Sequence, residues 1–201
     1  MRDSGIGRVL VASLHAAIAD LMPTRLGFYE SWLSPTALRT GQVGRGPMLA
    51  VCSFLRGEGT RYHAVTALAA RYATEWTLGG AVPDGAPGRR VVPLWWRRRR
   101  ALRAAARLLR SSDQRTRMSW RVRRGVATVI LRGATFCEVR EPVPAPLCHY
   151  AETVVTLLCT VHGVPEALTM TACEGMGQRT CTGTLQPLGG ATGTATQHHD
   201  A

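Results

Sequence analysis

Three cysteines in the last third of the chain are the residues whose side chains could carry the most specific chemistry. They are Cys148, Cys173 and Cys181. Thiolates are ligands that zinc prefers, and three of them with one further donor would complete a tetrahedral structural site. Their spacing does not match the paired C-x-x-C of zinc fingers. Spacing alone therefore leaves two interpretations open: a metal site, or small apolar side chains buried in a core.

The elements predicted around these cysteines would bring them together. Apolar residues recur at helical spacing over residues 148–163, and alternation predicts a strand over 166–173 with a returning strand over 180–185. Such a hairpin brings its two cysteines close to each other. Cys148, at the start of the helix, needs only to fold back against the hairpin. In a protein expected to be cytoplasmic, converging thiols favour structural zinc over a disulfide.

This C-terminal layout resembles the 4-vinyl-reductase-like domain family. The family includes an accessory factor of bacteriochlorophyll synthesis, the aromatic-sensing domains of some transcription activators, and archaeal hydrocarbon-binding proteins. Its pattern is a proline upstream of a helix-opening Cys, a Glu-x-x-Cys strand, a glycine turn and a final Cys. The matching residues here are Pro146, Cys148, Cys173, Gly175, Gly177 and Cys181. The resemblance is close over the last third of the chain and covers the rest in general layout.

The resemblance implies a ligand-binding fold like that of TRAPP vesicle-tethering subunits and NO-signalling domains, homodimers paired through N-terminal helices, and a bound zinc. One departure affects the metal site, because the ligating Glu of the family is Met170 here. The fourth ligand would then be His149, Glu174 or water. We assign His149 to the expected metal site with Cys148, Cys173 and Cys181. The other cysteines are predicted to be buried core residues: Cys52, Cys137 and Cys159.

The rest of the chain predicts an α+β fold. Helical spacing covers residues 8–22, 24–33, 47–55, 60–76 and 94–109, and alternation predicts strands over 118–123, 126–131 and 135–139. We expect one domain over residues 1–185, with N-terminal helices packed on an antiparallel sheet of about five strands and one helix inserted before the C-terminal hairpin. Residues 186–201 have little to bury and are expected to be a disordered tail.

Charge is the clearest compositional signal. The 201 residues carry a net charge of +12, and every basic side chain is arginine. Such a charge predicts affinity for nucleic acid or acidic lipid at low salt. The helix over 94–109 carries an expected anion patch of Arg97, Arg98, Arg99, Arg100 and Arg103. The alternative is a solvated helix face in a chain that contains no lysine.

A group of aromatic residues predicts a binding pocket between the helices and the sheet. Its expected lining is Trp95, Trp120, Phe136 and Tyr150. Flat rings of this kind suit a hydrophobic ligand, and the sensing members of the resembled family hold aromatic molecules in such a pocket. The alternative is ordinary core packing.

No catalytic motif supports an enzyme. The sequence has no G-x-S-x-G, no H-E-x-x-H and no phosphate loop, and GQVGRG at 41–46 lacks the setting of a dinucleotide site. The sequence contains no apolar run of about twenty residues, so no membrane-spanning helix is expected. We therefore expect a cytoplasmic binding module for a hydrophobic, aromatic or tetrapyrrole molecule that acts through a partner chain. Two alternatives remain: an accessory factor of (bacterio)chlorophyll biosynthesis, and a basic protein that binds acidic membrane or nucleic acid through residues 97–110.

Overall fold

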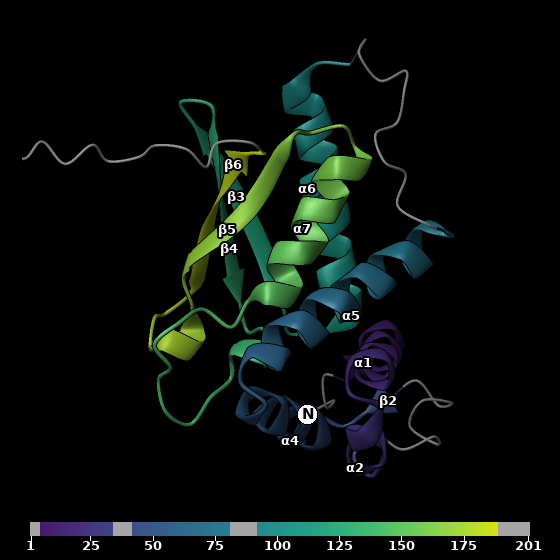
Figure 1. The fold of residues 1–201 in the computed structure, drawn as a ribbon. Helices are drawn as coiled ribbons and strands as arrows, with labels where there is room; N and C mark the ends of the chain where they lie inside the picture. Colours follow the sequence, from purple (N-terminus) through teal and green to yellow (C-terminus); the bar gives the residue numbers. More distant parts are fainter. Residues whose placement is uncertain (1–4, 34–41, 81–91, 189–201) are drawn as a thin grey trace, which may run out of the picture.

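The computed structural model describes residues 5–33, 42–80 and 92–188, and it has helices and a sheet in separate layers (Figure 1). The helices are α1 (Arg8–Leu21), α2 (Leu26–Glu30), α4 (Arg45–Gly57), α5 (Thr60–Leu78), α6 (Leu94–Ser112) and α7 (His149–Val161). Short 3-10 turns are η1 (Pro23–Arg25), η3 (Thr135–Cys137) and η4 (Glu174–Met176). The predicted α+β class is confirmed.

Within the described residues, the main sheet has four antiparallel strands in the order β3-β4-β6-β5. Their bounds are β3 (Arg117–Arg123), β4 (Val126–Arg132), β5 (Glu166–Ala172) and β6 (Cys181–Pro187). A separate pair joins β1 (Ile6–Gly7) to β2 (Gln42–Val43). Paired residues such as Trp120 and Val129 lie on the same face of the main sheet. The predicted hairpin of β5 and β6 is confirmed.

The fifth strand predicted over residues 135–139 is wrong. The chain there forms the turn η3, because the Asp113 carboxylate accepts hydrogen bonds from the Thr135 backbone N–H at 3.1 Å and from its hydroxyl at 2.6 Å. Cys137 then donates its backbone N–H to the carbonyl of Ala134 at 2.9 Å. These contacts curl the segment away from the sheet, toward the start of α7.

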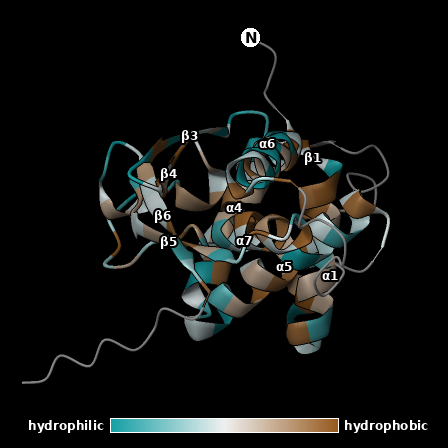
Figure 2. Ribbon diagram, turned by 90° about the horizontal axis from the view of Figure 1, so that it is seen from above, coloured by the Kyte–Doolittle hydropathy of each residue, from teal (hydrophilic) through white to brown (hydrophobic). Residues whose placement is uncertain are grey.

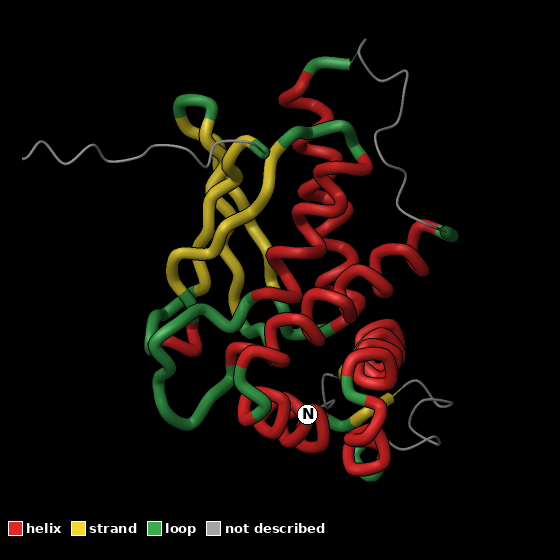
Figure 3. Tube along the Cα trace, in the orientation of Figure 1, coloured by secondary structure: helices red, strands yellow, loops and turns green. Residues whose placement is uncertain are grey.

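Helix α7 lies in the centre of the molecule, between the sheet and α5 (Figures 1 and 3). Its residues Tyr150, Val154 and Leu158 recur every fourth position and are buried, as expected for a helix face in a core. The helix ends before Gly163, which adopts a left-handed φ of 65° that favours glycine. The central position of α7 places Cys148, the residue just before the helix, next to the end of the sheet.

Strand β6 runs to Pro187, so the ordered fold extends past the predicted domain boundary at residue 185. Residues 189–201 of the predicted tail lie outside the described residues.

Within the described ranges, no single helix is long and apolar enough to cross a membrane. Helix α1 and the helical segment Pro23–Glu30 reach that length and hydropathy only as a pair bent by 117°.

Candidate metal centre

Four buried cysteines converge at the end of the sheet nearest to the start of α7. They are Cys137 in η3, Cys148 just before α7, Cys173 just after β5 and Cys181 at the start of β6, and their sulfur atoms all lie within 4.8 Å of one another. All four are free thiols. Three of them are the cysteines predicted to meet, and the arrangement is compatible with a metal site.

The separations suit tetrahedral coordination. The Sγ–Sγ distances are 3.2 Å from Cys137 to Cys148, 3.4 Å from Cys148 to Cys173, 3.6 Å from Cys137 to Cys181 and 3.8 Å from Cys173 to Cys181. Zn–S bonds of about 2.3 Å in a tetrahedron place the sulfurs roughly 3.8 Å apart. A disulfide would need about 2.05 Å. A cation could therefore sit among these sulfurs with only small movements of the side chains.

Backbone N–H groups point at two of the sulfurs. Cys173 Sγ accepts from Leu147 at 3.5 Å and from Gly175 at 3.3 Å, and Cys181 Sγ accepts from Glu174 at 3.2 Å. Gly175 permits this approach, because a Cβ there would come within 2.9 Å of Leu147 Cδ1 and 3.5 Å of Cys173 Sγ. Donors placed in this way stabilise negative charge on sulfur, which metal ligation requires.

Hydrogen bonds within the cluster shift the pKa values of Cys137 and Cys173 in opposite directions. Hydrogen bonds from Cys137, Cys148 and Cys181 lower the pKa of the Cys173 thiol well below its usual range. The hydrogen bond to Cys148 is the largest of the effects that raise the pKa of Cys137. These shifts favour the thiolate form at Cys173 and the protonated form at Cys137. A cation that binds all four sulfurs would displace the thiol protons.

The fourth position is filled by Cys137, and His149 lies outside the cluster. The His149 Nδ1 is 3.1 Å from Glu152 Oε2, and its ring centre is 4.2 Å from that of His63. Glu174 is also engaged elsewhere, since both of its carboxylate oxygens are 3.1 Å from the Gly133 backbone nitrogen. The sequence did not predict Cys137 as a ligand, because residues 135–139 were predicted to form a strand. A strand followed by a proline-rich connection does not predict that the Cys137 side chain faces Cys148.

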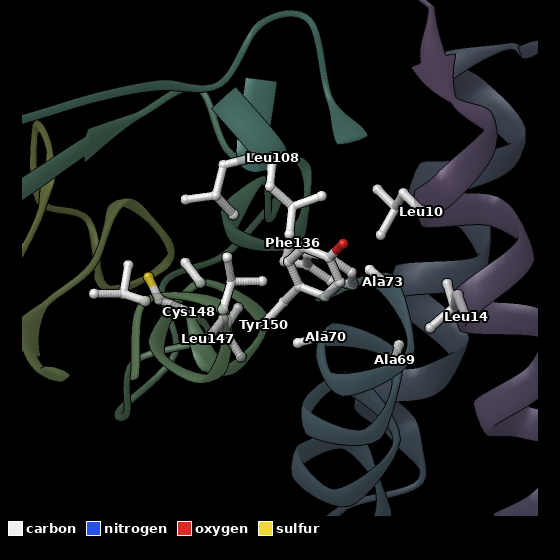
Figure 4. Packing of buried hydrophobic residues seen from close by; sticks show 14 of the residues in the cluster. Leu10, Leu14, Ala69, Ala70, Ala73, Leu108, Phe136, Leu147, Cys148 and Tyr150 are labelled. Carbon is white, nitrogen blue, oxygen red and sulfur yellow. The ribbon is translucent and has the colours of Figure 1, made fainter. Parts of the chain in front are cut away.

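The expected pocket residues separate into two groups. Phe136 and Tyr150 are buried and stacked, with ring centres 5.2 Å apart, and Figure 4 shows them in the packed interior facing Leu10 of α1. Trp120 is partly buried on the inner face of the sheet. Trp95 does not belong to a pocket, because the first turn of α6 projects from the core and leaves this side chain 63% exposed.

Phe136 and Tyr150 line a small internal chamber that adjoins the metal centre. Its volume is about 30 Å³, and Cys137 and Cys148 form part of its wall. The lining is mostly apolar. Its polar members are Asp113, Thr116, Thr135 and a hydroxyl pair in which Tyr150 Oη lies 3.1 Å from Ser112 Oγ. Burial raises the pKa of Tyr150 to about 12, so its hydroxyl stays protonated at neutral pH. An apolar cavity that admits benzene measures roughly 150 Å³, and this chamber has room for water only.

The expected anion patch is divided by the fold. Arg98 is buried and forms a two-pronged ion pair with Glu166, with Nε 2.8 Å from Oε2. Arg97 donates to the carbonyls of Val92 and Gly163. These two side chains hold α6 in place and do not project as a patch. Arg100 lies 4.0 Å above the Trp96 ring, and Arg99 and Arg103 are exposed.

No protein-family model, no curated protein and no solved structure matches the chain. The resemblance to the 4-vinyl-reductase-like family therefore stays a prediction.

Proposed function

We propose that this chain is a zinc-binding module in which Cys137, Cys148, Cys173 and Cys181 hold one Zn²⁺. The observation that supports this most directly is that four buried thiols lie at tetrahedral separations. Four soft sulfur donors select zinc or iron over magnesium and calcium. Four protein ligands would leave no position for a substrate, which is typical of a structural site. Zinc would tie η3, the start of α7 and the β5–β6 hairpin together at one point.

Substitution of Cys137 tests this proposal. Cys137→Ser should lower zinc from one ion per chain to much less than one, measured by elemental analysis of the purified protein. Cys159→Ser is the matched control, because Cys159 is also a free buried cysteine but lies outside the cluster. One zinc per chain in both variants would exclude the proposed ligand set. Iron in place of zinc would keep the site but change its metal, and a visible absorption band would reveal it.

We also propose that the module binds a small apolar molecule in the chamber beside the metal centre. The wall is mostly apolar, its Asp113 carboxylate is engaged by Thr116 and Thr135, and the Tyr150–Ser112 hydroxyl pair adds a further polar group. This is the pattern of a site for a compact ring bearing one polar group. The chamber volume of about 30 Å³ favours a small ligand over a tetrapyrrole, and binding would require Phe136 to move. Such a module would act through a partner chain or within a homodimer.

Enlargement of the chamber tests the ligand role. Phe136→Ala should bind phenol measurably more tightly than the unaltered chain, by about ten-fold or more, because the ring that fills the site has been removed. The Phe136→Ala/Tyr150→Phe double variant keeps the space and removes the hydroxyl, so it should lose part of that gain. Calorimetric titration measures all three. Equal, negligible phenol binding by all three would end the ligand proposal and leave the zinc proposal untouched.

A further inference from the structure

The outer face of α6 is a continuous basic stripe. Its exposed members are Arg99, Arg100, Arg103, Arg107 and Arg110. At about 100° per residue they fall within an arc of about 100°, opposite the face that is buried in the core. Figure 2 shows this outer side of α6 as hydrophilic. In the described part of the chain, none of the five forms an ion pair with a carboxylate.

A second basic area lies on the open face of the main sheet. Arg121, Arg123 and Arg132 are exposed there, on the face opposite to the helices. The register also sets Arg117 directly across from Arg132, and the Arg117 guanidinium donates to the carbonyls of Gln114 and Thr116. A row of threonines continues across the face: Thr128, Thr184 and Thr169. No acidic residue lies on this face in the described strands.

The two basic areas meet along the edge of the sheet. Strand β3 is the edge strand, and α6 packs against it. Figure 2 shows α6 and β3 next to each other along one border of the molecule. The stripe and the sheet face are therefore two sides of one basic corner, which we name the arginine corner: Arg99, Arg100, Arg103, Arg107 and Arg110 of α6 with Arg121, Arg123 and Arg132 of the sheet.

We propose that the arginine corner binds the phosphate backbone of duplex nucleic acid. Guanidinium groups pair with phosphates in a two-pronged geometry, and threonine hydroxyls donate to phosphate oxygens. The described strands place no aromatic side chain on the open sheet face, so it offers no platform on which single-stranded bases could stack. Binding through the backbone alone would be insensitive to sequence.

A duplex is favoured over an acidic membrane because of how α6 is packed. A membrane-surface helix must insert its apolar side, but that side of α6 is buried in the protein core through Ala101, Leu102 and Ala105. The large exposed apolar side chains of α6 are confined to its first turn, at Leu94, Trp95 and Trp96, and the Trp96 ring lies 4.0 Å below the Arg100 guanidinium. The part of α6 that carries the arginines therefore exposes positively charged side chains and little apolar surface.

The test is the binding of a fluorescent 24-base-pair DNA duplex over a range of salt concentrations. The unaltered chain should bind with an affinity that falls steeply with salt, with a slope of about −0.9 per phosphate contacted. The Arg103→Gln/Arg107→Gln/Arg110→Gln variant should bind at least ten-fold more weakly at about 0.1 M salt and should reduce the slope by about two to three. Binding should not depend on the base sequence of the duplex.

The control removes the same charge elsewhere. Arg61→Gln/Arg140→Gln/Arg179→Gln alters three exposed arginines outside the arginine corner. It should change affinity and slope much less than the α6 variant. Equal losses in the two variants would mean that net charge alone drives binding, and the proposal would fail. It would also fail if the chain bound vesicles rich in phosphatidylserine but no duplex, or no duplex even at 0.05 M salt. Zinc content and melting temperature check that each variant folds.

Discussion

At the scale of single residues, the candidate metal centre differs from the pattern of the resembled family at one position. The position where the resembled family has a ligating Glu is Met170, and its side chain packs over Gly183 of the neighbouring strand, where a Cβ would lie 2.6 Å from the Met170 sulfur. The Met170 thioether is therefore part of the hydrophobic core. Cys137, from the turn η3, supplies the fourth sulfur of the cysteine cluster. His149, the neighbour of Cys148, is held by Glu152, whose other oxygen accepts the Met170 backbone N–H at 2.6 Å.

The metal centre also shows why some of its residues were predictable and one was not. Cys173 and Cys181 are brought together by a hairpin, which local alternation and two turn glycines predict. The position of Cys137 depends on Thr135 bonding to Asp113, a contact between residues 22 positions apart. Sequence periodicity carries no information about a side-chain contact of that kind. The residue types therefore predicted a thiol cluster, but not its full membership.

At the scale of elements, helices and strands with strong periodicity were predicted close to their observed bounds. Helix α7 and the β5–β6 hairpin are examples, because their apolar faces alone specify what they bury. Helix α6 was predicted as an element but its charges were misassigned. Periodicity placed Arg98 among surface residues, whereas the approach of β5 supplies Glu166 as a buried partner. Partners supplied by distant strands decide which arginines are structural.

The Arg98–Glu166 pair should be a main attachment between α6 and β5. Both side chains are only 11% exposed, so each charge depends on the other for compensation. Arg98→Met should lower the free energy of unfolding by about 3 to 5 kcal/mol, because it leaves a buried carboxylate unpaired. Arg98→Met/Glu166→Leu should recover most of that loss. Denaturant melts measure both; an Arg98→Met loss below about 1 kcal/mol would contradict this role.

At the scale of the whole molecule, the four cysteines link segments that the chain separates widely. The turn η3, the start of α7 and the hairpin of β5 and β6 each contribute to the cysteine cluster, and Figure 1 shows these segments near one another. The chamber lies directly behind it and is bounded on its other side by Leu10 of α1. A change at the sulfurs should therefore affect the packing of the sheet against the helices, and not only the local loop.

Removal of the metal should accordingly destabilise the entire fold. A ligand present at about a hundred times its dissociation constant stabilises the native state by about 2.7 kcal/mol, and a domain of this size shifts its melting temperature by about 2 to 4 °C per kcal/mol. A strong zinc chelator should thus lower the melting temperature by roughly 5 to 10 °C, and added Zn²⁺ but not Mg²⁺ should restore it. Cys137→Ser should already melt near the lower temperature and should not respond to the chelator. An unchanged melting temperature for the unaltered chain in chelator, with zinc shown to be removed, would mean that hydrogen bonds among the thiols hold these segments together without a metal.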